Sequence, residues 1–163
     1  MKHWINLKNM KSMNIKEYIS MYKSLGNEKL RALYTWIEEV GKTYEYDKDL
    51  TSKLLKGNEP RIKLNGCYEN AFRMVHYTSG YIMGFYITEI GLPLEHAFNH
   101  VEGKGVDFTS CKYGFEVKDL FGIEVPLDVV IDWYEQSSQM PLLGFYYFHH
   151  VQKRGSEGTL FHV

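Results

Sequence analysis

The sequence predicts an α+β fold in which helices come first and antiparallel strands follow. Two helical patterns lie near the start of the chain, within residues 14–41. The run Tyr81–Ile90 is dense in aromatic and β-branched residues, which indicates a strand buried on both faces. Residues 96–109 contain two short strand-like runs around a glycine-rich turn and therefore predict a hairpin. Helices segregated from antiparallel strands are typical of the α+β class.

The first two elements are predicted helices, each with an apolar stripe at helical spacing. Asn14 and Glu17 form a capping-box pattern for the first helix, and Gly26 is placed to end it. The second helix is expected to begin near Asn27 and to end near Gly41. The two stripes consist of Ile15, Tyr18, Ile19 and Tyr22, and of Leu30, Leu33, Tyr34 and Ile37. The polar segment that follows, 43–61, is expected to be a connection with about one helical turn.

The later elements follow from changes in composition after Pro60. Residues 67–76 have helical spacing, and the strand Tyr81–Ile90 comes next. The hairpin strands are predicted at 96–101 and 106–109 around Glu102-Gly103-Lys104-Gly105. Pro126 is placed to open a last helix, and 144–151 is predicted to be a final strand.

Length and charge restrict the organisation and the partners. The 163 residues are expected to form a single domain, with an N-terminal helical region 1–60, a core 61–151 and a loose C-terminal tail 152–163. The formal charge of −1 offers no basic field for nucleic acid or for an anionic membrane. The longest apolar runs fall short of a membrane span. We expect a soluble cytoplasmic protein with reduced cysteines and no cofactor.

Cys67 is the residue with the clearest chemical context. It follows Gly66 and opens a predicted helix, where backbone N–H groups and the helix dipole favour a thiolate. The same N–H groups are suited to stabilise an oxyanion after attack on a carbonyl. The other cysteine, Cys111, has no such context, and we interpret it as a packing residue.

The hairpin supplies a candidate base and a candidate carboxylate. His96 and His100 lie at even spacing and therefore share one face of the first strand. With the turn centred on Gly103 and Lys104, Asp107 lies opposite His100 on that same face. A cysteine, a histidine and an aspartate in this arrangement are what a proton relay for a thiol nucleophile requires.

Three motifs together resemble the transglutaminase-like branch of the papain-like cysteine hydrolases. They are Asn65-Gly-Cys-Tyr-Glu-Asn-Ala-Phe-Arg, Glu95-His-Ala-Phe-Asn and Val106-Asp-Phe-Thr. By pattern the chain resembles small bacterial and phage-type thiol hydrolases, including peptidases of lasso-peptide maturation. The resemblance covers about 64–109 and implies a papain-like core at 61–151, with the cysteine helix packed on an antiparallel sheet and extra N-terminal helices. It implies a catalytic triad of Cys67 as nucleophile, His96 as base and Asp107 as orienting acid.

The choice of base is the point at which geometry and resemblance differ. A regular hairpin places His96 four residues beyond the partner of Asp107, or about 13 Å away at ~3.3 Å per residue. Either the hairpin is irregular, or His100 is the base. The resemblance favours His96, because the family places the base directly before an alanine and an aromatic residue. Asn65 is a possible oxyanion donor through its side-chain amide, or else a turn residue before Gly66.

The predicted activity is a cysteine protease, amidase or acyltransferase acting on a peptide, a protein, or a small amide or thioester. One alternative is a catalytically inactive papain-fold module, possibly phage-encoded, that sequesters a ligand or a protein partner. Another alternative is a zinc site that uses His96 and His100, with His149 and His150 as further candidates. The sequence fixes no complete ligand set, so we expect no metal. The oligomeric state is left open.

Overall fold

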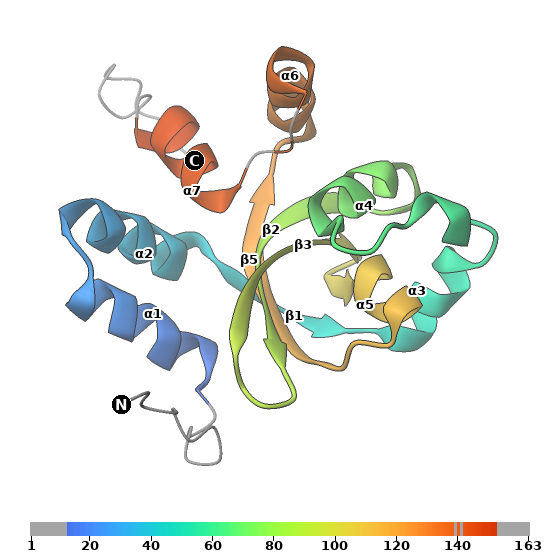
Figure 1. Ribbon diagram of the computed structural model, residues 1–163, viewed down its shortest axis with the longest axis horizontal. Helices are drawn as coiled ribbons and strands as arrows, with labels where there is room; N and C mark the ends of the chain where they lie inside the picture. Colours follow the sequence, from blue (N-terminus) through green and yellow to red (C-terminus); the bar gives the residue numbers. More distant parts are fainter. Residues whose placement is uncertain (1–12, 139, 141, 153–163) are drawn as a thin grey trace, which may run out of the picture.

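The computed structural model of the protein, shown in Figure 1, describes residues 13–138, 140 and 142–152. The mixture of helices and mainly antiparallel strands places it in the α+β class, as the sequence predicts. The helices are α1 Ile15–Leu25, α2 Glu28–Val40, α3 Lys48–Leu55, α4 Cys67–Arg73, α5 Phe108–Tyr113, α6 Leu127–Ser137 and α7 Leu143–Tyr146. The strands are β1 Lys42–Tyr46, β2 Gly80–Thr88, β3 Pro93–Val101, β4 Lys104–Val106 and β5 Val117–Val125.

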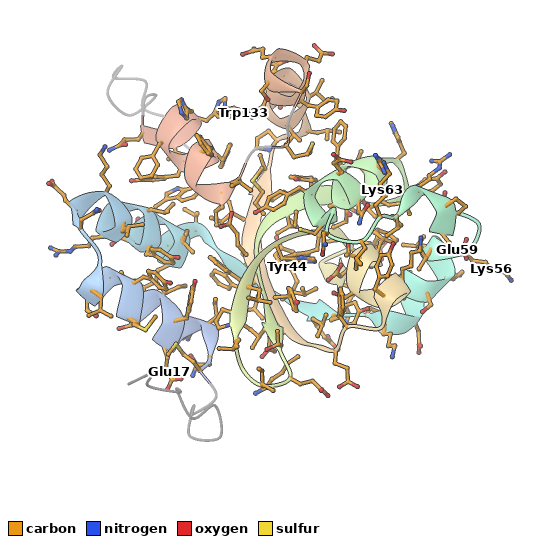
Figure 2. The ribbon with its side chains drawn as sticks, viewed as in Figure 1. Glu17, Tyr44, Lys56, Glu59, Lys63 and Trp133 are labelled. Atoms are coloured by element: carbon orange, nitrogen blue, oxygen red, sulfur yellow. The ribbon has the colours of Figure 1, made fainter. Side chains whose placement is uncertain are left out.

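The five strands form a closed barrel in the order β1-β4-β3-β2-β5, with β5 returning to β1. All neighbours are antiparallel except β1 and β4, which run parallel. Four strands each send one buried side chain to a common cluster: Tyr44, Ile82, Phe98 and Leu120. Figure 2 shows Tyr44 at the centre of the molecule among the strands. These residues share a small core because a five-stranded barrel leaves little interior space.

Helices cover the outside of the barrel in two groups. Figure 1 shows α1, α2 and α7 to one side of the strands, and α3, α4 and α5 to the other. The largest core cluster joins Ile37 of α2 and Ala71 of α4 to Met83 of β2. A second cluster packs Leu55 of α3 against Phe108 of α5. Within the described part of the chain, no helix is both long and apolar enough to cross a bilayer.

The two N-terminal helices agree with the sequence prediction. Asn14 accepts a hydrogen bond from the Glu17 N–H at 2.9 Å, and the Glu17 carboxylate accepts one from the Asn14 N–H at 3.0 Å. This reciprocal pair is the predicted capping box. Gly26 and Gly41 end α1 and α2, as expected.

The predicted connection at 43–61 is wrong. It contains β1, the helix α3 and a short 3₁₀ turn at Glu59–Arg61. β1 is only five residues long, and its one buried side chain is Tyr44, so its alternation is too short to stand out in the sequence. The predicted N-terminal helical region 1–60 therefore contributes a strand to the barrel.

The predictions near the C-terminal end are partly wrong. α6 begins directly after Pro126, as predicted, but the expected final strand at 144–151 is helical, in α7 and a wider turn at Tyr147–Val151. Its aromatic residues pack on other helices, as Tyr147 does on Trp36 at 5.1 Å between ring centroids. Aromatic content favoured a strand, but packing between helices decides the conformation. Apart from Gln152, the predicted tail 152–163 lies outside the described residues.

Candidate active site

Cys67 is the first residue of α4, as the sequence predicts. The loop before it is fixed by Asn70, which is fully buried one turn into the helix. Its side-chain oxygen accepts from the Lys63 N–H at 2.9 Å, and its amide donates to the Lys63 carbonyl at 2.7 Å. Asn70 also donates to the Thr109 hydroxyl at 3.0 Å, which ties the nucleophile helix to α5. This network fixes the position of the backbone that carries the Cys67 side chain.

His96 and Asp107 form a buried hydrogen-bonded pair. The distance from His96 Nε2 to Asp107 Oδ2 is 2.8 Å, and the side chains are 5% and 1% exposed. Because Nε2 is engaged by the carboxylate, Nδ1 is the ring nitrogen left to exchange a proton with Cys67. The carboxylate therefore fixes the orientation of the imidazole.

All remaining acceptor positions on Asp107 are used by helix α5. Its Oδ1 accepts from the N–H groups of Thr109 and Ser110, each at 3.1 Å, so Asp107 is the N-cap of the helix. The Ser110 hydroxyl donates to Oδ2 at 2.5 Å. Four donors thus surround one buried carboxylate, which keeps its charge stable in an apolar setting.

The three groups shift one another's pKa values toward an ion pair. Burial raises the pKa of the Cys67 thiol, but the His96 imidazole and the Ala97 backbone N–H lower it by more. Burial lowers the pKa of His96, but the Asp107 carboxylate and the Cys67 thiol raise it by more. Burial raises the pKa of Asp107, and His96 and Ser110 reverse that effect. The result favours thiolate and imidazolium, the reactive state of a cysteine nucleophile.

The hairpin has a different register from the one predicted. Its turn is centred on Glu102 and Gly103, both at positive φ (50° and 82°), with Val101 paired to Lys104 and His100 to Gly105. The prediction that Asp107 lies opposite His100 is therefore wrong. Both central residues have positive φ, and Glu102 rather than Lys104 shares the centre of the turn with Gly103.

The predicted second strand at 106–109 is also wrong, and this difference brings His96 and Asp107 together. β4 stops at Val106, and the chain turns into α5 at Asp107. The regular-hairpin estimate of about 13 Å no longer applies, because Asp107 has left the ladder and points back to His96. The resemblance required an irregular hairpin. The irregularity is that β4 ends at Val106 and the next residue, Asp107, is the N-cap of α5.

His100, the alternative base, lies elsewhere in the barrel. Its Nε2 is 3.4 Å from the Glu124 carboxylate, and its ring is 5.7 Å from the Tyr44 ring. The structure brings His96, and not His100, to Asp107.

Asn65 is exposed at a φ of 59° in the left-handed region, as its turn interpretation predicts. It is also one of the residues that line a hollow of about 230 Å³ at Cys67: Asn65, Gly66, Cys67, Tyr68, Glu69, Ser138 and Met140.

Four residues of the site were not identified from the sequence. Ser110 and Asn70 act through hydrogen bonds that only the fold brings about, and Ala97 does so through its backbone. Tyr86 packs against the barrel core, as the sequence predicts, and its ring also stands edge-on to His96, with 4.8 Å between centroids. The even spacing of Tyr86 from Ile82 along the strand was the one signal that it faces the same side as the barrel core.

The two cysteines are both free thiols, and Cys111 contacts Ser52 with 3.3 Å between Sγ and Oγ. The four histidines considered for zinc do not come together. In the described residues no group of three or more His, Cys, Asp or Glu side chains is placed to hold an ion. His149 instead stacks on Phe145 in the C-terminal helices.

Comparisons with family models, with curated proteins and with solved structures found no match to this chain. Inferences about its activity therefore rest on the geometry of the site.

Proposed function

We propose that this protein is a cysteine-nucleophile hydrolase or acyltransferase that acts on an amide or thioester bond through Cys67, His96 and Asp107. The observation that carries the proposal is the buried His96, which is bonded to Asp107 through Nε2 and lowers the pKa of the Cys67 thiol. This is the arrangement by which an imidazole activates a thiol and a carboxylate orients the imidazole.

The proposed reaction has two steps. The Cys67 thiolate attacks the substrate carbonyl carbon, and the carbon–nitrogen bond breaks as the His96 imidazolium gives its proton to the leaving nitrogen. The product is an acyl-enzyme thioester and a free amine. Water or another amine then attacks the thioester and gives a proton to His96, and the carbon–sulfur bond breaks to restore the thiolate. Water makes the protein a peptidase or amidase, and an amine makes it an acyltransferase.

The papain-like, transglutaminase-like core is part of the same proposal. It is supported by the chain order of cysteine, histidine and aspartate, and by the packing of α4, which carries Cys67, on β2 and β3. The Asn99 side chain donates to the Ala71 carbonyl at 3.0 Å and holds the helix on the strand that carries His96. The substrates proposed are peptides, proteins, or small amides and thioesters, in the reducing cytoplasm that two free thiols suit.

The test uses the second cysteine as an internal control. The full chain is treated with iodoacetamide across a pH series, and alkylation of Cys67 and Cys111 is followed by peptide mass mapping. We expect Cys67 to react faster than Cys111 at and below neutral pH, because the His96 imidazole lowers the pKa of the Cys67 thiol. Equal rates would overturn the activated thiolate.

A second measurement addresses the acyl-enzyme directly. p-Nitrophenyl acetate should release a stoichiometric burst of p-nitrophenolate and leave an acetyl group on Cys67. The Cys67→Ala variant should lose the burst, and Cys111→Ala should keep it. A chain that alkylates normally but never acetylates would instead support the non-catalytic binding module.

A further inference from the structure

A second hollow lies next to His96, apart from the one that contains Cys67. It has a volume of about 440 Å³ and is lined by the end of β2, the residues directly after it and the loop between α5 and β5: Tyr86, Thr88, Glu89, Ile90, Gly114, Phe115 and Glu116. None of these residues lines the hollow at Cys67. The site therefore has two separate concave surfaces.

Tyr86 connects this hollow to the proposed base. Its ring contacts the His96 imidazole at an interplanar angle of 67°, and it also forms the wall of the hollow. Burial is the largest cause that raises the pKa of the Tyr86 hydroxyl, and the charges of Asp107 and Cys67 raise it further. Tyr86 is therefore close enough to the triad to interact with it electrostatically. The Tyr86 ring is thus what separates a molecule bound in the hollow from His96.

The chemistry of the reaction decides which part of a substrate belongs there. His96 must deliver a proton to the leaving nitrogen, so the leaving half of the substrate lies on the His96 side. The acyl half stays bonded to Cys67, beside the other hollow. The Tyr86 hollow is therefore placed to receive the amine half.

The lining residues define the chemical class of that half. Ile90 and Phe115 are 69% and 44% exposed, and with Tyr86 they offer apolar surface to an alkyl stem. Glu89 and Glu116 are exposed in the same hollow, and neither forms an ion pair with another described residue. Lys48 lines the adjoining hollow that shares Phe115 and Glu116, but it makes no ion pair with Glu116 there. Apolar walls with two free carboxylates complement a long side chain that ends in a cation.

We propose that the Tyr86–Phe115 hollow is the subsite for the amine half of the substrate and that it selects a residue with a lysine or arginine side chain. This inference rests on the proposed function, because it assigns a specificity to the same triad. The aromatic rings would pack on the alkyl stem, and Glu89 and Glu116 would pair with the charge.

The test uses the second step of the reaction, in which an added amine competes with water for the acetyl-enzyme. The amine nitrogen attacks the thioester carbonyl, its proton passes to His96, and the carbon–sulfur bond breaks to give an N-acetyl product. Acetyl-enzyme formed from p-nitrophenyl acetate is offered either arginine amide or citrulline amide. These two acceptors have nearly the same shape and differ in the charge of the side chain.

We expect arginine amide to be acetylated about fivefold more efficiently than citrulline amide, as two exposed charge pairs would give. The double variant Glu89→Gln, Glu116→Gln should abolish that preference and keep the burst. The matched variant Glu135→Gln, on the exposed surface of α6, should leave the preference unchanged.

Two failures can be told apart. A normal burst with equal use of both amides, or a preference that survives the double variant, would overturn the subsite and leave the proposed function intact. Absence of a Cys67-dependent burst would overturn the proposed function and the subsite with it.

Discussion

The Asp107 carboxylate that begins helix α5 is also the hydrogen-bond partner of His96, with 2.8 Å between Oδ2 and Nε2. One side chain thus determines where β4 stops, where α5 starts and how the proposed base is oriented. A change at this position affects the local fold and the site together, so the two effects must be separated by experiments that report on each.

Replacement of Asp107 by asparagine should destabilise the protein by about 3 kcal/mol near pH 5, because it leaves a buried imidazole without its charge partner. The pKa of Asp107 is lowered by folding, so its contribution is present above the unfolded value of 3.8 and is lost as the pH falls through the folded value. The pKa of His96 is raised, so its contribution is present below the unfolded value of 6.5 and is lost as the pH rises through the folded value.

The cost of Asp107→Asn should therefore be largest between pH 3.8 and 6.5 and smaller on either side. Urea unfolding of both proteins at several pH values measures it. A cost that does not change with pH would show that the carboxylate acts on stability only as a helix cap.

Replacement of His96 by glutamine should raise the pKa of the Cys67 thiol, because the imidazole is the first group that lowers it against the effect of burial. Less of the thiol is then ionised at a pH below its pKa. Iodoacetamide alkylation at about pH 6 should slow by about tenfold or more at Cys67. The rate at Cys111 should not change, and equal slowing at both cysteines would indicate a general change in the fold.

Replacement of Ser110 by alanine removes a hydroxyl that donates to the same carboxylate at 2.5 Å. Hydrogen bonds to charged groups contribute about 1.5–3 kcal/mol, and a gain in helix propensity offsets a few tenths of that. We expect a loss of about 1.5 kcal/mol in the free energy of unfolding and a raised pKa for Asp107. Ser24→Ala is the matched control, since its exposed hydroxyl donates to the Met21 carbonyl within α1. Equal effects of the two substitutions would contradict a special role for Ser110.

The three residues of the proposed triad could be named from the sequence, but their arrangement and the residues that support them could not. Cys67 was found from the glycine and the helix that surround it, and both are local features. The pairing of His96 with Asp107 depends on the chain leaving β4 after three residues, which local propensity does not encode. A one-residue shift of the turn moved every expected cross-strand partner by two residues, because register is set by turn geometry.

Long-range contacts explain the other differences. β1 has no pattern of its own and is a strand because β4 and β5 lie on either side of it. The aromatic segment 144–151 is helical because Trp36 and Trp133 offer rings for it to pack on. The helices α1 and α2 could be predicted well because their caps and stripes lie within a few turns of sequence.

Replacement of Gly84 by alanine should destabilise the barrel by about 3 kcal/mol through overpacking. Gly84 on β2 is paired with Gly122 on β5, and an added Cβ would lie 2.0 Å from the Phe121 carbonyl oxygen. The strands would have to separate, because the atom in contact belongs to the backbone.

The control for this substitution is Gly144→Ala in α7, where an added Cβ would be in ordinary contact with the Leu33 side chain at 3.9 Å. It should be neutral or stabilise the protein by up to about 1 kcal/mol through helix propensity. Thermal unfolding of the two variants measures the difference. A Gly84→Ala variant as stable as Gly144→Ala would mean that the strands can move apart at little cost.

The position of β1 between β4 and β5 has a consequence for the order of events during synthesis. Cys67, His96 and Asp107 all emerge from the ribosome before β5, and β1 emerges before all of them. The ring closes only when Val117–Val125 is available to join β1 to β2. A nascent chain that ends before that strand carries every group of the triad, yet it lacks the closed frame that holds them. The proposed site is therefore completed late, after contacts between residues some eighty positions apart have formed.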